Sequence, residues 1–168
     1  MIRSIFLTVM LGLTLHITAQ ETKKVDSLEI GNGRITSYLA GKNKDVSVYV
    51  DQTWIMVYGY GFPRIRIETA LHSSIIEMVC LPSVLKGVTW AWARRDSATQ
   101  ANERLYIFTG DDTHLSATWS PLGGAWSYAI VFGNAVDPIS SSAFQDLIQF
   151  FQEAMKIIVG LPPGEHKY

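Results

Sequence analysis

Hydrophobic and polar residues alternate along much of the chain, in short runs that turn-forming residues separate. Residues 33–39 and 45–51 alternate in this way, and the Gly, Asn and Asp between them favour a hairpin. Residues 64–69 alternate again, which predicts that Ile65 and Ile67 point inward and that the charged residues beside them point outward. This part of the chain is therefore predicted to form half-buried strands.

The same pattern continues through most of the remaining chain. Residues 53–61 are apolar on both faces, which predicts a central strand that is covered on both sides. Further strands are predicted over residues 88–96, 104–110, 114–120 and 126–133. A spacing of roughly ten residues per strand, with turn signals between strands, is typical of an antiparallel meander.

Residues 71–86 carry conflicting signals. Ser74 followed three residues later by Glu77 resembles a capping box, which favours a short helix. The β-branched Ile75, Ile76 and Val79 favour a strand, and Pro82 would end either element. We favour the strand.

The C-terminal segment predicts an amphipathic helix that ends at Gly160, before two prolines. Ser142 with Gln145 forms a capping box at its start. The apolar stripe consists of Phe144, Leu147, Ile148, Phe151, Met155 and Ile158. Burial of such side chains contributes roughly 1.5–3 kcal/mol each before entropy is subtracted, so the helix must lie on the sheet.

These elements predict an α+β fold, because a body of strands is closed by one helix. We expect a predominantly antiparallel β-sheet, a meander of roughly eight to ten short strands, packed against one C-terminal α-helix. Residues 20–160 are expected to form a single domain and residues 161–168 a flexible tail.

The N-terminus predicts export. Arg3 precedes a mostly apolar run over residues 5–15, and Ala19 offers a small side chain at a cleavage point, so residues 1–19 are typical of a signal peptide. A membrane-spanning helix needs roughly 20 apolar residues, so a stable membrane anchor is not expected. The alternative is a retained amphipathic segment. We expect a periplasmic or secreted protein, with a bacterial origin.

Composition narrows the class further. Hydrophobic residues make up 48% of the chain and charged residues 17%, a balance typical of a globular protein. The formal net charge of −1 provides no clustered positive field, which argues against nucleic acid as a partner. Cys80 is the only cysteine, so no internal disulfide is possible, and its apolar neighbours predict a small buried residue.

One polar stretch could carry chemistry. Asp111, Asp112 and His114 lie between two strand-like runs, after Gly110. Gly and Asp favour a chain reversal, so we interpret the stretch as a turn. A zinc site usually needs three or four ligands, and this stretch supplies fewer. We predict neither a metal nor a cofactor, and the alternative function is a small hydrolase that uses these three residues.

Aromatic residues offer the stronger functional signal, since the chain holds five Trp and seven Tyr. Several occur as i, i+2 pairs on predicted strands, where they would share a face and form a flat, partly polar platform. The predicted ligand-binding residues are Tyr58 with Tyr60, Trp90 with Trp92 and Arg94, and Trp126 with Tyr128. The alternative is that these rings fill the core beneath the helix.

We therefore expect a non-enzymatic, exported binding protein that uses an aromatic-bearing sheet face. Its partner would be a protein, such as a toxin that it neutralises, or a small apolar or glycan ligand. A third possibility, beside the hydrolase, is a structural subunit of a cell-envelope assembly.

Overall fold

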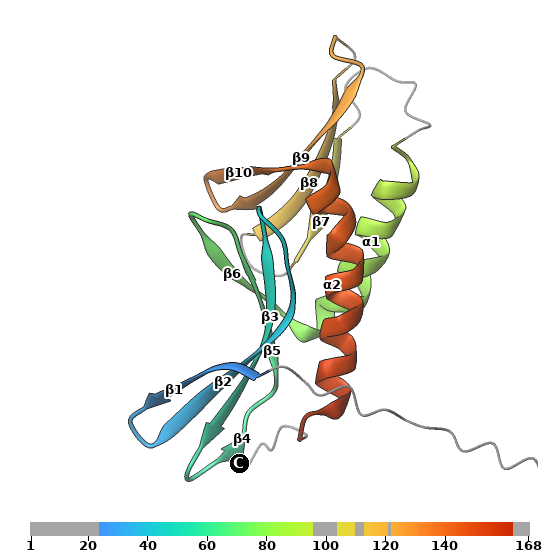
Figure 1. The fold of residues 1–168 in the computed structure, drawn as a ribbon. Helices are drawn as coiled ribbons and strands as arrows, with labels where there is room; N and C mark the ends of the chain where they lie inside the picture. Colours follow the sequence, from blue (N-terminus) through green and yellow to red (C-terminus); the bar gives the residue numbers. More distant parts are fainter. Residues whose placement is uncertain (1–23, 96–103, 110–112, 121, 163–168) are drawn as a thin grey trace, which may run out of the picture.

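The computed structural model describes residues 24–95, 104–109, 113–120 and 122–162 (Figure 1). Within these residues the chain forms ten β-strands in two antiparallel sheets, and two α-helices. The predicted fold class, a mostly antiparallel β-sheet protein with a C-terminal helix packed on the sheet, is confirmed. The predicted signal peptide lies outside the described residues, as does most of the predicted tail. None of the described helices has the length and apolarity needed to cross a membrane.

The first sheet, called sheet A, has the strand order β1-β2-β3-β5-β6, and β4 pairs with the outer end of β3. Its strands are β1 (Lys24–Ile30), β2 (Gly33–Lys42), β3 (Ser47–Ile55), β4 (Gly59–Tyr60), β5 (Arg64–Glu68) and β6 (Ser73–Ile76). The hairpin predicted between residues 33 and 51 is confirmed as β2–β3. Ile65 and Ile67 are fully buried, whereas Arg64 is exposed, which also agrees with the prediction.

The second sheet, called sheet B, has the order β10-β9-β8-β7. Its strands are β7 (Arg104–Phe108), β8 (Thr113–Ser120), β9 (Ala125–Phe132) and β10 (Ala135–Ile139). Three of the four correspond to predicted strands. The pattern did not predict β10, which carries Pro138 and lies at the edge of the sheet, where a missing N–H is tolerated.

The strand predicted over residues 88–96 is wrong. After a short 3-10 turn η1 (Met78–Cys80), helix α1 (Leu81–Ala93) occupies most of this segment, and only β6 fulfils the strand favoured over residues 71–86. Pro82 lies in the first turn of α1, where a helix does not need the missing N–H, so it begins the helix instead of ending an element. The buried residues of α1 follow helical spacing: Leu81, Val84, Val88 and Ala91.

The covered central strand predicted over residues 53–61 is also wrong. The chain reverses between Ile55 and Gly59, and the side chains of the turn face solvent. Met56 and Val57 are 70% and 67% exposed. The apolar run is therefore the tip of a β3–β4 hairpin.

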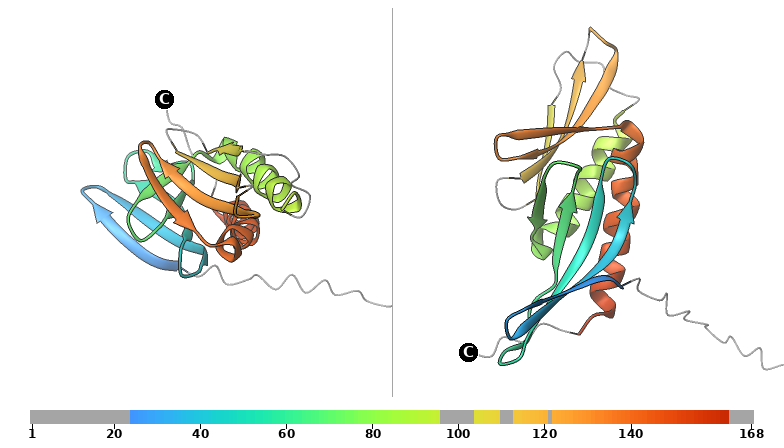
Figure 2. Two further views of the ribbon diagram at one scale, coloured as in Figure 1. Left: turned by 90° about the horizontal axis from the view of Figure 1, so that it is seen from above. Right: turned by 60° about the vertical axis from the view of Figure 1, so that its left-hand side comes forward.

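The helices lie next to each other and cover one side of the molecule (Figures 1 and 2). Helix α2 (Ser141–Gly160) packs on sheet A, and a Cβ atom at Gly41 in β2 would lie 1.9 Å from Cδ1 of Phe150 in α2. Helix α1 packs on sheet B, where a Cβ atom at Gly87 would lie 2.9 Å from Cγ2 of Ile107 in β7. We call the face of sheet A toward α2 the inner face.

The apolar stripe of α2 fills the core much as predicted. Phe144, Leu147 and Phe151 are fully buried, while Met155 is 39% exposed and Ile157 is buried in its place. The predicted capping box is wrong, because Ser140, and not Ser142, is the N-cap: its Oγ accepts a hydrogen bond from the backbone N–H of Ala143 at 3.3 Å.

Candidate ligand-binding groove

The inner face of sheet A changes from core to surface along β3. Val48 and Val50 are fully buried, whereas Trp54, on the same face, is only half-buried. The outer ends of β1 to β4 extend away from α2 (Figure 1). This end of the sheet carries aromatic and charged side chains that no helix covers completely.

Four side chains form one row across four strands. In the strand register, Glu29 of β1 lies opposite Arg34 of β2, Arg34 lies opposite Trp54 of β3, and Trp54 lies opposite Tyr60 of β4. Residues directly opposite one another in a sheet share a face, with Cβ atoms roughly 4.5–5.5 Å apart. We call these four residues the cross-strand row.

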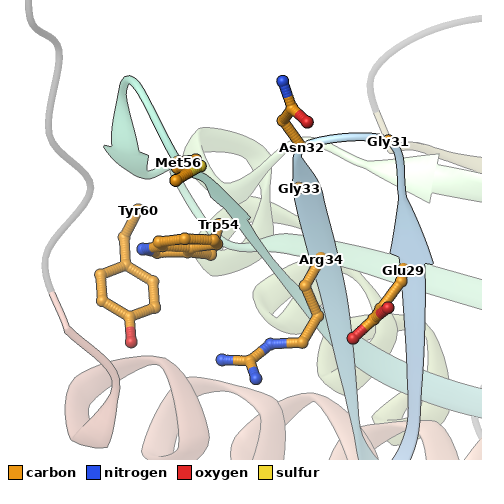
Figure 3. Close-up of a pocket in the computed structure, with 8 residues that line it drawn as sticks. All are labelled: Glu29, Gly31, Asn32, Gly33, Arg34, Trp54, Met56 and Tyr60. Atoms are coloured by element: carbon orange, nitrogen blue, oxygen red, sulfur yellow. The ribbon is translucent and has the colours of Figure 1, made fainter.

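The cross-strand row lines an open groove of about 570 Å³ (Figure 3). The other lining residues are Gly31 and Asn32 of the β1–β2 turn, Gly33 at the start of β2, and Met56 of the β3–β4 turn. The side chains of Arg34, Trp54 and Tyr60 all project toward the side on which α2 lies. The groove therefore presents a guanidinium and a carboxylate beside two aromatic rings.

Local turn chemistry fixes this arrangement. Gly31 has a φ of 54°, the left-handed conformation that a two-residue hairpin turn requires and that glycine adopts without strain. The turn Gly31–Asn32 places Ile30 opposite Gly33, and the register then brings Glu29 opposite Arg34. A slip of one residue would move the charged pair to the other face.

The polar groups of the groove are not engaged within the described part of the chain. There, the side chains of Glu29 and Arg34 form no hydrogen bond and no ion pair, and neither Trp54 nor Tyr60 stacks on another ring. Arg66 behaves differently: its Nε lies 2.7 Å from Oδ2 of Asp51. Among the described residues, the side-chain donors and acceptors of the groove therefore have no partner.

Tyr58 and Tyr60 do not form the predicted pair on one strand face, because Tyr58 lies in the β3–β4 turn and only Tyr60 lies in a strand, β4. Tyr60 lines the groove, whereas Tyr58 lies in the turn and is 56% exposed. The opposite face of this end of the sheet is apolar, because Leu28, Ile30 and Ile55 lie there and are largely exposed.

Trp90, Trp92 and Arg94 do not form the predicted flat strip, because they lie on a helix and not on a strand. Successive turns of 100° send residues i and i+2 of a helix to nearly opposite sides. Trp92 packs near Tyr128, with ring centroids 6.2 Å apart, while Trp90 is 51% exposed. The Arg94 guanidinium lies 4.8 Å above the Trp90 ring.

Trp126 and Tyr128 share one face of β9, as predicted for a strand pair, but their rings serve packing. Tyr128 is buried and stacks on Phe144 of α2, with centroids 4.3 Å apart. Trp126 donates from Nε1 to the backbone carbonyl of Arg95 at 3.1 Å and lies 5.7 Å from Trp119. Trp92 thus packs with Tyr128, whereas Trp90 pairs with Arg94. None of the five predicted residues on α1 and β9 lines the groove.

The polar stretch considered for hydrolysis is described only in part. Asp111 and Asp112 lie outside the described residues, and His114 lies in β8 with its ring 5.2 Å from that of Tyr106. No cluster of three or more metal-ligating side chains occurs among the residues that the structure describes. This stretch stays a prediction.

A different histidine meets a carboxylate where the two sheets join. Nδ1 of His72, after β5, lies 2.9 Å from Oδ2 of Asp137 in β10, and Thr69 hydrogen-bonds the same carboxylate. Burial raises the pKa of Asp137, but the hydrogen bonds from Thr69 and His72 and the charge of His72 outweigh it, so the pKa lies below its ordinary value. Asp137 is only 4% exposed, so we interpret this pair as a link between the sheets.

Comparison with known proteins gives this chain no relatives. No family model, no curated protein and no solved structure matches it. A function for the groove has to be argued from its own side chains.

Proposed function

We propose that this chain is a non-enzymatic, exported binding protein whose ligand occupies the groove at the outer end of sheet A. One observation carries the proposal: a continuous row of two aromatic rings and two opposite charges lines the groove, and none of the four side chains is engaged within the described residues. Export rests on the N-terminal pattern of a charged residue, an apolar run and a small residue at Ala19.

The size and chemistry of the groove support a ligand. Its volume of about 570 Å³ lies within the roughly 300–1,000 Å³ of small-molecule sites, which combine apolar walls with a few placed polar groups. A half-buried Trp offers a flat apolar surface with a polar edge, so it gains from being covered. A small apolar ligand, a glycan, or a loop of a partner protein would each cover the rings.

Substitution of the central ring tests the proposal. A panel of neutral oligosaccharides, aromatic acids and aromatic amines is screened by thermal shift against the wild type, Trp54→Ala and Trp90→Ala. We expect at least one compound class to raise the Tm of the wild type and of Trp90→Ala but not of Trp54→Ala. Trp90 is a matched control, because it is also an accessible Trp but lies on α1, outside the groove.

The opposite pattern would overturn the proposal. If no class raises the Tm of the wild type, or if every effect persists in Trp54→Ala, the groove is not a binding site. If Trp90→Ala and not Trp54→Ala abolishes binding, the end of α1 is the site that the aromatic pattern predicted.

A further inference from the structure

We infer that the groove binds a neutral, polyhydroxylated ring, that is, a pyranose unit of an uncharged glycan. This inference rests on the proposed function and names the ligand class of the same site. It follows from the order of the four side chains in the cross-strand row, which runs from carboxylate to guanidinium to indole to phenol.

The first argument is hydrogen-bond complementarity. At neutral pH the Glu29 carboxylate only accepts hydrogen bonds and the Arg34 guanidinium only donates them. A hydroxyl group does both, so the rim of a sugar ring satisfies the two neighbouring groups together. Neither group has another partner among the described residues to satisfy it once water is displaced.

The same pair of charges disfavours other ligand classes. A carboxylate on the ligand would pair with Arg34 but would be repelled by Glu29, one strand away. An ammonium group on the ligand would pair with Glu29 but would be repelled by Arg34. A wholly apolar ligand would bury two charged groups without partners, which is costly. An uncharged ligand with both donors and acceptors meets every group in the row without placing a like charge beside Glu29 or Arg34.

The second argument is the flat surface beside the charges. One face of a pyranose ring presents C–H groups, which suit the face of an aromatic ring, while its hydroxyls point outward around the rim. A ring that lies on Trp54 therefore directs rim hydroxyls toward Arg34 on one side and toward Tyr60 on the other. In Figure 3 the Arg34 guanidinium and the Tyr60 hydroxyl flank the Trp54 ring.

The length of the row favours an oligosaccharide over a single sugar. The row crosses three inter-strand steps of about 4.8 Å each, so it is longer than one six-membered ring. Glu29 and Arg34 at one end are exposed, so a glycan chain can continue past them. Affinity should therefore increase from the monosaccharide to the oligosaccharide.

Three hexasaccharides of equal length but different charge provide the test. The probes are cellohexaose, which is neutral, hexagalacturonate, which is acidic, and the hexamer of glucosamine, which is basic. We expect cellohexaose to bind the wild type at least tenfold more tightly than either charged hexamer and than glucose, by titration calorimetry at 150 mM salt. Trp54→Ala should reduce that affinity at least tenfold.

The charged variants make the readout specific to the row. In Glu29→Gln the ratio of the affinity for cellohexaose to that for hexagalacturonate should fall, because the variant removes a negative charge that repels the acidic hexamer. In Arg34→Gln the ratio of the affinity for cellohexaose to that for the basic hexamer should fall, because the variant removes a positive charge. Glu77→Gln and Arg64→Gln are controls of the same charge change at exposed positions outside the groove, and they should leave all three affinities unchanged.

The outcomes separate the inference from the proposed function. Tighter binding of a charged hexamer, or binding of cellohexaose that survives Trp54→Ala, would overturn the inference. If no hexamer binds but another panel compound binds in a Trp54-dependent way, the glycan assignment fails and the proposed function stands. If nothing binds in a Trp54-dependent way, both fail.

Discussion

Gly41 lies directly beneath a ring of α2, and the structure leaves no space for a side chain there. A Cβ atom at this position would lie 1.9 Å from Cδ1, 2.3 Å from Cγ and 2.4 Å from Cε1 of Phe150. Carbon atoms in contact are ordinarily about 3.5–4.0 Å apart, so Gly41→Ala forces either the Phe150 ring or strand β2 to move by roughly 1.5 Å or more. Overpacking of this kind costs about 1–3 kcal/mol.

The assay is urea unfolding followed by tryptophan fluorescence, with Gly61→Ala as the matched control. Gly61 follows β4 and does not have a positive φ. A Cβ atom added at Gly61 would lie 3.7 Å from the nearest atoms, which belong to Thr53, and this is an ordinary contact distance. We expect Gly41→Ala to lower the free energy of unfolding by about 1–3 kcal/mol, and Gly61→Ala to change it by less than about 0.5 kcal/mol. In a domain of this size each kcal/mol lowers Tm by about 2–4 °C.

A double-mutant cycle tests the cause. In a Phe150→Ala background the clash is gone, so the additional cost of Gly41→Ala should fall nearly to zero, and the coupling free energy should be about 1–3 kcal/mol. Equal costs of Gly41→Ala in both backgrounds would refute the packing of α2 on β2. So would an effect no larger than that of Gly61→Ala.

Two further predictions concern the ends and joints of the fold. Ser140→Ala should lower the free energy of unfolding by about 1 kcal/mol, because it removes the hydroxyl that caps α2 and that donates to Asp45, while the backbone N–H of residue 140 still donates to Asp45. Ser142→Ala at an exposed position should change the free energy of unfolding by less than half as much, and equal effects would contradict the assignment of the cap. Asp137→Asn should cost about 1–3 kcal/mol at pH 7 by weakening the buried link to His72 and Thr69. Because the folded-state pKa of Asp137 is lowered, the contribution of its carboxylate to the free energy of unfolding is fully present above the ordinary pKa of 3.8. This contribution is lost as the pH falls through the lower pKa of the folded state. In urea unfolding between pH 6 and 3, the stability of Asp137→Asn should therefore depend less steeply on pH than that of the wild type.

Alternation predicted the strands well because a sheet with one buried face imposes it locally. Burial alternates along β5, β8 and β9, so short segments contain enough information to predict them, whereas β2 and β3 also contain adjacent buried residues. The local pattern does not predict helix α1, because its second half reads V-T-W-A-W-A, which also has a period of two, and because a proline inside an element ordinarily ends it. The helix forms since Leu81, Val84 and Val88 all reach the core, a tertiary fact that the local pattern does not contain.

The candidate site was predictable only in part. The aromatic pattern predicts Tyr60, whereas it does not point to Glu29 and Arg34, because no strand is predicted over the residues of β1. A two-residue turn at Gly31–Asn32 would have placed these two residues opposite each other by the hairpin rule alone. The sequence pattern does not place Trp54 in a groove, because Val50 and Trp54 both lie on the inner face of β3. Val50 is buried and Trp54 is half-buried only because α2 covers one part of the strand and not the other, which the local pattern does not contain.

The groove and the packing of α2 are coupled through one irregularity in β2. The register of β2 with β3 shifts between Leu39 and Gly41, and such a bulge bends a strand and increases its twist. Gly41, at this bulge, lies against Phe150, while the outer ends of β2 and β3 extend away from the helix (Figure 1). Sheet A is thus held to α2 at the bulge and diverges from it beyond, which leaves Trp54 only half-buried. Substitutions at Gly41 should therefore change both the stability and the proposed ligand binding, whereas substitutions in the cross-strand row should change the proposed binding alone.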